Sequence, residues 1–118
     1  MIQSYKQNPI LQATYDTIII GSGMGGLATA AILSKEGKKV LVLERHYTAG
    51  GFTHIFKRKG YEWDVGIHYI GEVQRENSVL KKLFDYVTES QLKWADMGNV
   101  YDRIIIGDQR FDLVKGVK

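Results

Sequence analysis

Residues 17–36 read TIIIGSGMGGLATAAILSKE, and this stretch decides the fold class. It places Gly21, Gly23 and Gly26 in the spacing G-x-G-x-x-G, between a β-branched run and a run rich in Ala and Leu. Residues 17–20 lack alternation, which predicts a strand buried on both faces of a parallel sheet. Residues 24–36 predict a helix, because Gly37 stands where a helix commonly ends.

A second apolar run, VLVL at residues 40–43, follows the predicted helix closely. A strand, helix and strand of this length are typical of a right-handed βαβ crossover, with the glycines at its first turn. The sequence therefore predicts an α/β fold that begins with a Rossmann-like βαβ unit.

The three glycines have separate roles in such a turn. Gly21 permits the tight turn, Gly23 lets the backbone approach a pyrophosphate, and Gly26 lets helix and strand pack closely. Glu44 ends the second strand 18 residues after Gly26, where an acid accepts hydrogen bonds from a ribose diol. A tight turn without a ligand and a solvated strand end are the alternatives, but the combination favours a dinucleotide site.

The rest of the chain predicts smaller elements. Residues 1–14 are polar and contain Pro9, which indicates a flexible arm before a domain over 15–118. Short strands or loops are expected from Gly60 onward, and a hairpin over 100–106 and 110–114 around Gly107-Asp108-Gln109. Asn77 or Ser78 is expected to cap an amphipathic helix that ends near Val87, with one face in the core: Val79, Leu80, Leu83, Phe84 and Val87.

Composition excludes several classes of site. The chain has no cysteine, which rules out disulfides, thiolate zinc sites, iron–sulfur clusters and a catalytic thiol. The three histidines, His46, His54 and His68, lack the spacing of a helical metal site, and we predict no metal. Redox chemistry would therefore come from a bound cofactor.

The net charge of +3 is unevenly spread, and Lys57-Arg58-Lys59 is its densest basic segment. A solvated turn explains this segment, and contact with an anionic membrane surface is the alternative. No nucleic-acid-binding signature accompanies the charge, so no nucleic acid partner is expected. Neither a signal peptide nor a membrane-spanning stretch is evident, so we expect a cytoplasmic location, with peripheral membrane contact as an option.

Residues 21–51, GSGMGGLATAAILSKEGKKVLVLERHYTAGG, resemble the FAD-binding start of the flavin oxidoreductases that include phytoene desaturases, carotenoid isomerases and amine oxidases. Two later stretches, GYEWDVGIHYIG at 60–71 and QLKWADMGNVYDRIII at 91–106, are most similar to the retinol saturase (all-trans-retinol 13,14-reductase) branch of that family. Phe52 departs from the pattern, because many relatives carry arginine after the glycine pair.

The resemblance implies an FAD cofactor and hydride transfer between the flavin and a C=C bond of a retinoid or carotenoid-like polyene. The doublet Gly50-Gly51 favours FAD over a cofactor with nicotinamide alone. The residues expected to bind the cofactor are Gly21, Ser22, Gly23, Met24, Gly25, Gly26, Glu44, Arg45, Gly50, Gly51 and Thr53.

By the same resemblance, Asp64, Gly66 and His68 approach the isoalloxazine ring. His68 is the candidate catalytic residue, as a proton donor, and structural hydrogen bonding is its alternative role. An aromatic group is expected either to line an apolar channel for the polyene or to lie in the core: Tyr61, Trp63 and Tyr69.

Relatives in this family are several times longer. We therefore expect residues 15–118 to be the N-terminal part of an incomplete FAD-binding domain, which needs the remainder of the same protein and is inactive alone. An NAD(P)-binding Rossmann module and a non-catalytic dinucleotide-binding or interaction fragment are the alternative functions.

Overall fold

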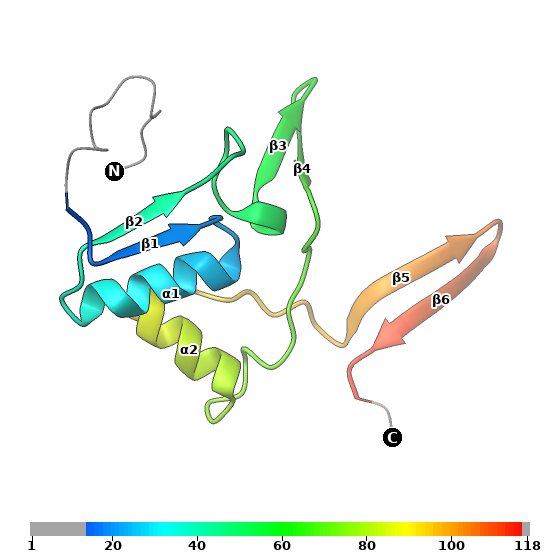
Figure 1. The fold of residues 1–118 in the computed structure, drawn as a ribbon. Helices are drawn as coiled ribbons and strands as arrows, with labels where there is room; N and C mark the ends of the chain where they lie inside the picture. The colour runs from blue at the N-terminus through cyan, green and yellow to red at the C-terminus, as the bar shows by residue number, and fades with distance from the viewer. Residues whose placement is uncertain (1–13, 117–118) are drawn as a thin grey trace. The chain divides into compact units, whose positions relative to one another are not determined.

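The computed structural model describes residues 14–116. The chain divides between Ile70 and Gly71 into two compact units (Figure 1). The first unit contains β1 (Thr17–Ile20), α1 (Met24–Lys35), β2 (Val40–Leu43), the short 3-10 helix η3 (Gly51–Thr53), β3 (Ile55–Arg58) and β4 (Tyr61–Asp64). The second contains α2 (Val79–Thr88), β5 (Val100–Ile106) and β6 (Gln109–Val114). The arm predicted for residues 1–14 lies, except for Thr14, outside the described residues.

The first unit is built on the predicted βαβ crossover. β1 and β2 pair in parallel, with Thr17 opposite Val40 and Ile20 opposite Leu43. α1 connects the two strands and contacts both of them (Figure 1). The predicted α/β class and its Rossmann-like start are confirmed.

The end of α1 shows why Gly37 follows it. Gly37 has φ of +79°, and its N–H donates to Ser34 O at 3.0 Å. The next N–H, of Lys38, donates to Leu33 O at 3.0 Å, which completes a Schellman motif. The helix therefore ends at Lys35, one residue before the predicted end, and Glu36 is its C-cap.

Burial of β1 on both faces was expected, and this prediction is wrong for the described chain. Exposure alternates along the strand, with Ile18 57% and Ile20 88% exposed. The reason is that α1 packs against the two-stranded sheet while the side chains that point the other way stay exposed. The apolar pattern shows that both faces of the strand are suited to burial. Whether each face is buried depends on the layers that pack against it.

A second pair of strands follows the crossover. β3 and β4 form an antiparallel hairpin with Phe56 opposite Trp63, and their two-residue turn is Lys59-Gly60, both with positive φ. Short strands or loops were expected from Gly60 onward, and β4 is such a strand. β3 was not predicted, because Lys57 and Arg58 were interpreted as part of a solvated turn whereas both lie within the strand.

In the second unit, Ser78 is the N-cap of α2 and Asn77 is not. Its Oγ accepts a hydrogen bond from Lys81 N at 3.0 Å and donates one to Glu72 O at 2.5 Å. The apolar stripe of α2 is only partly covered, since none of its residues is fully buried. The Phe84 ring packs edge-on against Trp94, at 5.0 Å between centroids. The expectation of a core face was therefore too strong for the described chain.

The predicted hairpin near the end of the chain is present as β5 and β6. Ile106 pairs with Gln109, so the turn contains only Gly107 and Asp108 and is one residue shorter than expected. Arg103 and Asp112 form an ion pair across the two strands. Within residues 14–116, no helix combines the length and apolar character that crossing a bilayer requires.

Candidate functional site

The glycine turn between β1 and α1 is as tight as its sequence predicts. Gly21 has φ of +99°, and its N–H donates to Leu43 O at 2.7 Å. A Cβ on Gly26 would lie 2.2 Å from Gly21 O and 3.4 Å from the Ile19 side chain. Gly26 therefore permits the close contact between helix and turn, which is the role that its position in the motif predicted.

The N-terminus of α1 is open. Its N-cap, Gly23, makes no side-chain capping hydrogen bond, and the first turn of the helix contains no acid. Among residues 14–116, nothing lies within 4 Å of a Cβ built on Gly21, Gly23 or Gly25. The first N–H groups of a helix have no partner within the helix and carry the positive end of its dipole, and with glycines at this end the arrangement suits a phosphate.

The Glu44 carboxylate lies at the glycine turn. Its Oε2 accepts hydrogen bonds from Ser22 Oγ at 2.6 Å and from Ser22 N at 2.8 Å, and its Oε1 accepts one from His46 N at 2.7 Å. Ser22 is only 2% exposed. The acid that ends β2 is thus held against the turn that follows β1.

These hydrogen bonds lower the pKa of Glu44 from 4.5 to about 2, with the Ser22 hydroxyl as the largest cause. The His46 and Ser22 backbone N–H groups add to the shift, while partial desolvation opposes it. Glu44 is therefore ionised at neutral pH.

The hydrogen-bond donors around Glu44 change the expectation that its carboxylate is free to bind a ribose. A carboxylate offers about four acceptor positions. The chain itself supplies the Ser22 hydroxyl and the backbone N–H groups of Ser22, His46 and Arg45. A ribose diol would therefore exchange with at least one of these donors, whereas the sequence predicted a carboxylate free to accept both hydroxyls.

The doublet Gly50-Gly51 packs against the first glycine turn. Gly50 N–H lies 3.1 Å from Ser22 O and 3.2 Å from Ser22 Oγ. A Cβ on Gly51, where φ is +58°, would lie 3.0 Å from Gly23 Cα. The structure shows the backbone of this doublet pressed against the backbone of the first turn, and its predicted contact with a ligand stays a prediction.

Thr53 and Met24 complete this arrangement. Thr53 Oγ1 donates to Gly50 O at 2.7 Å and lies 3.6 Å from Met24 Sδ. The structure therefore brings together nearly all of the residues expected to bind the cofactor, and Arg45 beside them is exposed. Their roles toward a cofactor stay predictions.

The residues expected at the flavin end lie in an open segment. His68 is exposed, and its Nδ1 is 3.3 Å from Asp64 Oδ2. A Cβ on Gly66 would lie 2.9 Å from Phe52 Cβ, so Phe52 packs against this glycine. His68 as a proton donor stays a prediction, and its observed partner matches the structural alternative.

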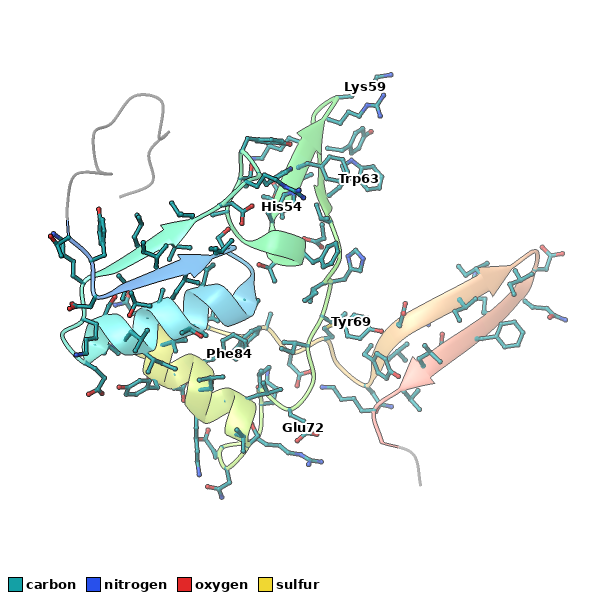
Figure 2. The ribbon with its side chains drawn as sticks, in the orientation of Figure 1. His54, Lys59, Trp63, Tyr69, Glu72 and Phe84 are labelled. Carbon is teal, nitrogen blue, oxygen red and sulfur yellow. The ribbon has the colours of Figure 1, made fainter. Side chains whose placement is uncertain are left out.

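The aromatic group is neither core nor channel lining in the described chain. Tyr61, Trp63 and Tyr69 are all exposed, and Figure 2 labels Trp63 and Tyr69. Sequence reasoning also missed that His46 and His54 meet, with ring centroids 4.9 Å apart. Their separation of eight positions gives no signal for this contact, because the loop conformation creates it.

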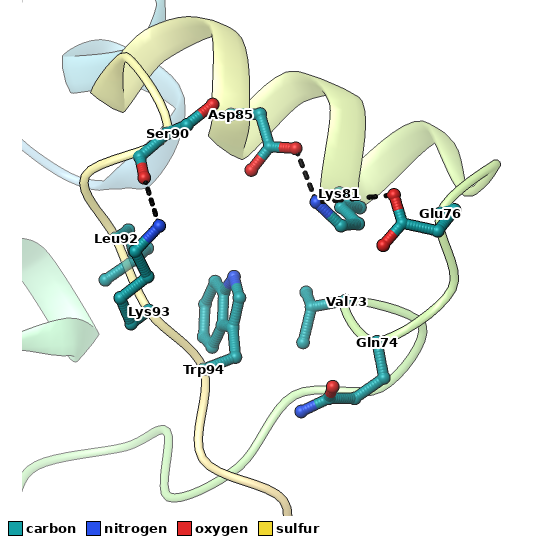
Figure 3. Close-up of a pocket in the computed structure, with 9 residues that line it drawn as sticks. All are labelled: Val73, Gln74, Glu76, Lys81, Asp85, Ser90, Leu92, Lys93 and Trp94. Atoms are coloured by element: carbon teal, nitrogen blue, oxygen red, sulfur yellow. Dashed lines mark hydrogen bonds and ion pairs between the residues drawn. The ribbon is translucent and has the colours of Figure 1, made fainter.

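A separate polar cavity of about 220 Å³ lies in the second unit (Figure 3). Lys81 bridges to Asp85 at 2.6 Å on its wall, and the side-chain amino group of Lys93 donates to Ser90 O at 2.9 Å. Trp94 Nε1 is buried there without a hydrogen-bond partner among the described residues. None of the residues predicted to bind a cofactor lines this cavity.

Comparison with known proteins agrees with the geometry of the glycine turn. The family model described as an NAD(P)-binding Rossmann-like domain matches residues 19–87, more than half of the chain. The chain belongs to this family. The match includes both glycine loops and Glu44.

Several curated proteins are similar to the chain over part of their length. An all-trans-retinol 13,14-reductase of Danio rerio is 51% identical over 78% of the chain and 15% of its own length. An inactive all-trans-retinol 13,14-reductase of the same species is 40% identical over 91% of the chain and 19% of its own length. A chloroplastic prolycopene isomerase 2 of an Oncidium hybrid cultivar is 50% identical over 44% of the chain and 9% of its own length. The chain thus spans less than a fifth of the length of each.

Proposed function

We propose that this chain is the dinucleotide-binding segment of an FAD-dependent oxidoreductase that transfers hydride between the flavin and a C=C bond of a retinoid or carotenoid-like polyene. The observation that carries the proposal is the uncapped N-terminus of α1 beside the ionised Glu44 carboxylate. The helix N-terminus suits a diphosphate and the carboxylate suits a ribose, and an adenine dinucleotide contains both.

The chain's own residues define how the adenosine diphosphate end would bind. The N–H groups at the start of α1 would donate to the diphosphate, and the open space at Gly23 and Gly25 would let it approach. Glu44 would accept hydrogen bonds from the ribose hydroxyls. Its negative charge would also repel a 2′-phosphate, so we expect cofactors with a free 2′-hydroxyl to bind better than NADPH.

The names of the relatives favour FAD over NAD. The retinol reductase and prolycopene isomerase names concern reactions of polyenes, and a bound flavin would supply the hydride chemistry there. Similarity at this level also includes a relative named inactive. Because the chain spans less than a fifth of the length of these relatives, we expect the 118-residue chain to bind FAD weakly without turnover.

The test is a titration of the purified chain with FAD, NADH and NADPH, followed by their fluorescence. We expect FAD to bind most tightly and Glu44→Gln to weaken it about tenfold, since one charge-assisted contact is lost. Glu36→Gln is the matched control, because Glu36 is an exposed acid at the other end of α1. Equal affinity of both variants for FAD would contradict the proposed site.

An NAD(P)-binding module is the second candidate, and the description of the matching family model favours it. The same titration separates the two candidates. Saturable binding of NADH or NADPH that exceeds the affinity for FAD would select the second candidate, whereas a yellow complex with flavin absorption bands would select the first.

A further inference from the structure

The β3–β4 hairpin has one face that carries three exposed aromatic rings and no carboxylate. Phe56 lies opposite Trp63, and Arg58 lies opposite Tyr61. Because side chains alternate along a strand, these four residues share a face. Phe56 is 41%, Trp63 54% and Tyr61 69% exposed. Figure 2 shows Lys59 at the tip of the hairpin, with Trp63 further along it.

The charges of the hairpin are sorted between its two faces. Lys57, Glu62 and Asp64 lie on the opposite face, where Lys57 pairs with Glu62 at 2.9 Å. Within residues 14–116, no ion pair involves Arg58 or Lys59. The aromatic face and the tip are therefore cationic without compensation, while both acids of the hairpin lie on the other side.

We propose that this face of the β3–β4 hairpin is a contact surface for the interface of an anionic lipid bilayer. Aromatic rings settle at the boundary between headgroups and acyl chains, where tryptophan and tyrosine keep their polar atoms hydrated. Cations beside them attract anionic headgroups. The four-residue strands are about 13 Å long, which lets the face lie flat within the interfacial layer.

The charge pattern favours lipid over other occupants. A single-stranded nucleic acid is held by cations that follow its backbone over several nucleotides, whereas this hairpin offers two unpaired cations at one end. A protein layer over the same face would itself have to supply a carboxylate for Arg58, whereas the headgroups of an anionic bilayer supply the negative charge without a specific partner. The proposal does not depend on the cofactor, because none of these residues is among those expected to bind it.

The experiment measures binding of the 118-residue chain to vesicles of phosphatidylcholine with 30% phosphatidylserine, and to vesicles of phosphatidylcholine alone. We expect co-sedimentation with the anionic vesicles that weakens with salt. Arg58→Gln and Lys59→Gln should each weaken the affinity about fivefold. Lys57→Gln is the matched control, since it removes the same charge from the opposite face, and it should change the affinity little.

Fluorescence supplies a second measurement. The chain has two tryptophans, so the Trp94→Phe variant reports on Trp63 alone. We expect its emission to shift to the blue on anionic vesicles. The proposal is overturned if the native chain does not co-sediment, if Lys57→Gln and Arg58→Gln weaken binding equally, or if an oligothymidylate binds more tightly than the vesicles and loses affinity in the same variants. The co-sedimentation measurements do not use the Trp94 variant, so they test the proposal even if that variant fails to fold.

Discussion

Ser22 and Glu44 are 22 positions apart in the chain and are joined by two hydrogen bonds, from the Ser22 hydroxyl at 2.6 Å and from its N–H at 2.8 Å. The same hydroxyl lies 3.2 Å from Gly50 N. One buried side chain therefore connects the glycine turn, the acid that ends β2 and the second glycine loop. We infer that Ser22 acts as a positioning residue, because it orients Glu44 and leaves the phosphate position to the backbone.

Ser22→Ala should raise the pKa of Glu44 from about 2 toward 4.5, since the hydroxyl is the largest cause of the lowered value. The bond from Ser22 N–H stays, so the recovery should be incomplete. The measurement is a carboxyl ¹³C titration by NMR. Ser34→Ala, at an exposed serine of α1, is the control and should leave the pKa of Glu44 unchanged.

Lowering the pH should reduce the free energy of unfolding, and protonation of Glu44 is one cause. Its folded-state pKa is lowered, so its contribution to the free energy of unfolding is complete above about pH 4.5 and is lost as the pH falls toward 2. The lowered pKa values of Asp96 and Asp112 act in the same direction. Urea unfolding between pH 2 and 6 should therefore show the native chain and Glu44→Gln converging as the pH falls. Parallel curves would mean that Glu44 is not held as the structure shows.

Gly25 and Gly26 lie in the first turn of α1, and substitution by alanine should affect stability differently at the two positions. Gly26→Ala places a Cβ against the Gly21 carbonyl, and we expect the free energy of unfolding to fall by at least about 2 kcal/mol. Gly25→Ala meets open space inside a helix, so stability should be unchanged or rise by up to about 1 kcal/mol. Urea denaturation compares the two. A similar loss in both variants would rule out the close approach at Gly26.

Contact between the two glycine loops can be tested in a similar way. Gly51 and Gly60 both have positive φ, but of the two only Gly51 has a neighbour within 4 Å of a built Cβ in the described part of the chain. Both alanine variants carry the cost of a left-handed backbone, about 1–2 kcal/mol. Gly51→Ala should be less stable than Gly60→Ala by roughly a further 1 kcal/mol, because Gly23 Cα is in the way. Thermal denaturation of the pair measures the difference.

Local patterns were sufficient to predict the crossover. The residues of β1, α1 and β2 follow one another with short connections, and Gly37 marks the helix end through its own backbone conformation. The role of Gly26 followed in the same way from its position in the motif. These features depend on residues close in sequence, where propensity and turn chemistry act directly.

Features that depend on distant residues were not predictable. The link from Ser22 to Glu44 requires the fold to bring two loops together, and nothing in the serine itself indicates it. The same holds for Gly50, whose N–H points to Ser22 and not to open space. Exposure of Ile20 was missed because an apolar pattern does not reveal which layers cover it. β3 was missed because its basic residues suggested a solvated turn.

The most direct test of the account is a titration of the ¹⁵N-labelled chain with ADP, the part that FAD and NAD share. We predict that the largest amide shifts occur at Gly23, Gly25 and Gly26, with further shifts at Ser22 and Glu44. Shifts confined to the cavity around Trp94, or none at millimolar ADP in a folded chain, would contradict a dinucleotide site at the glycine turn.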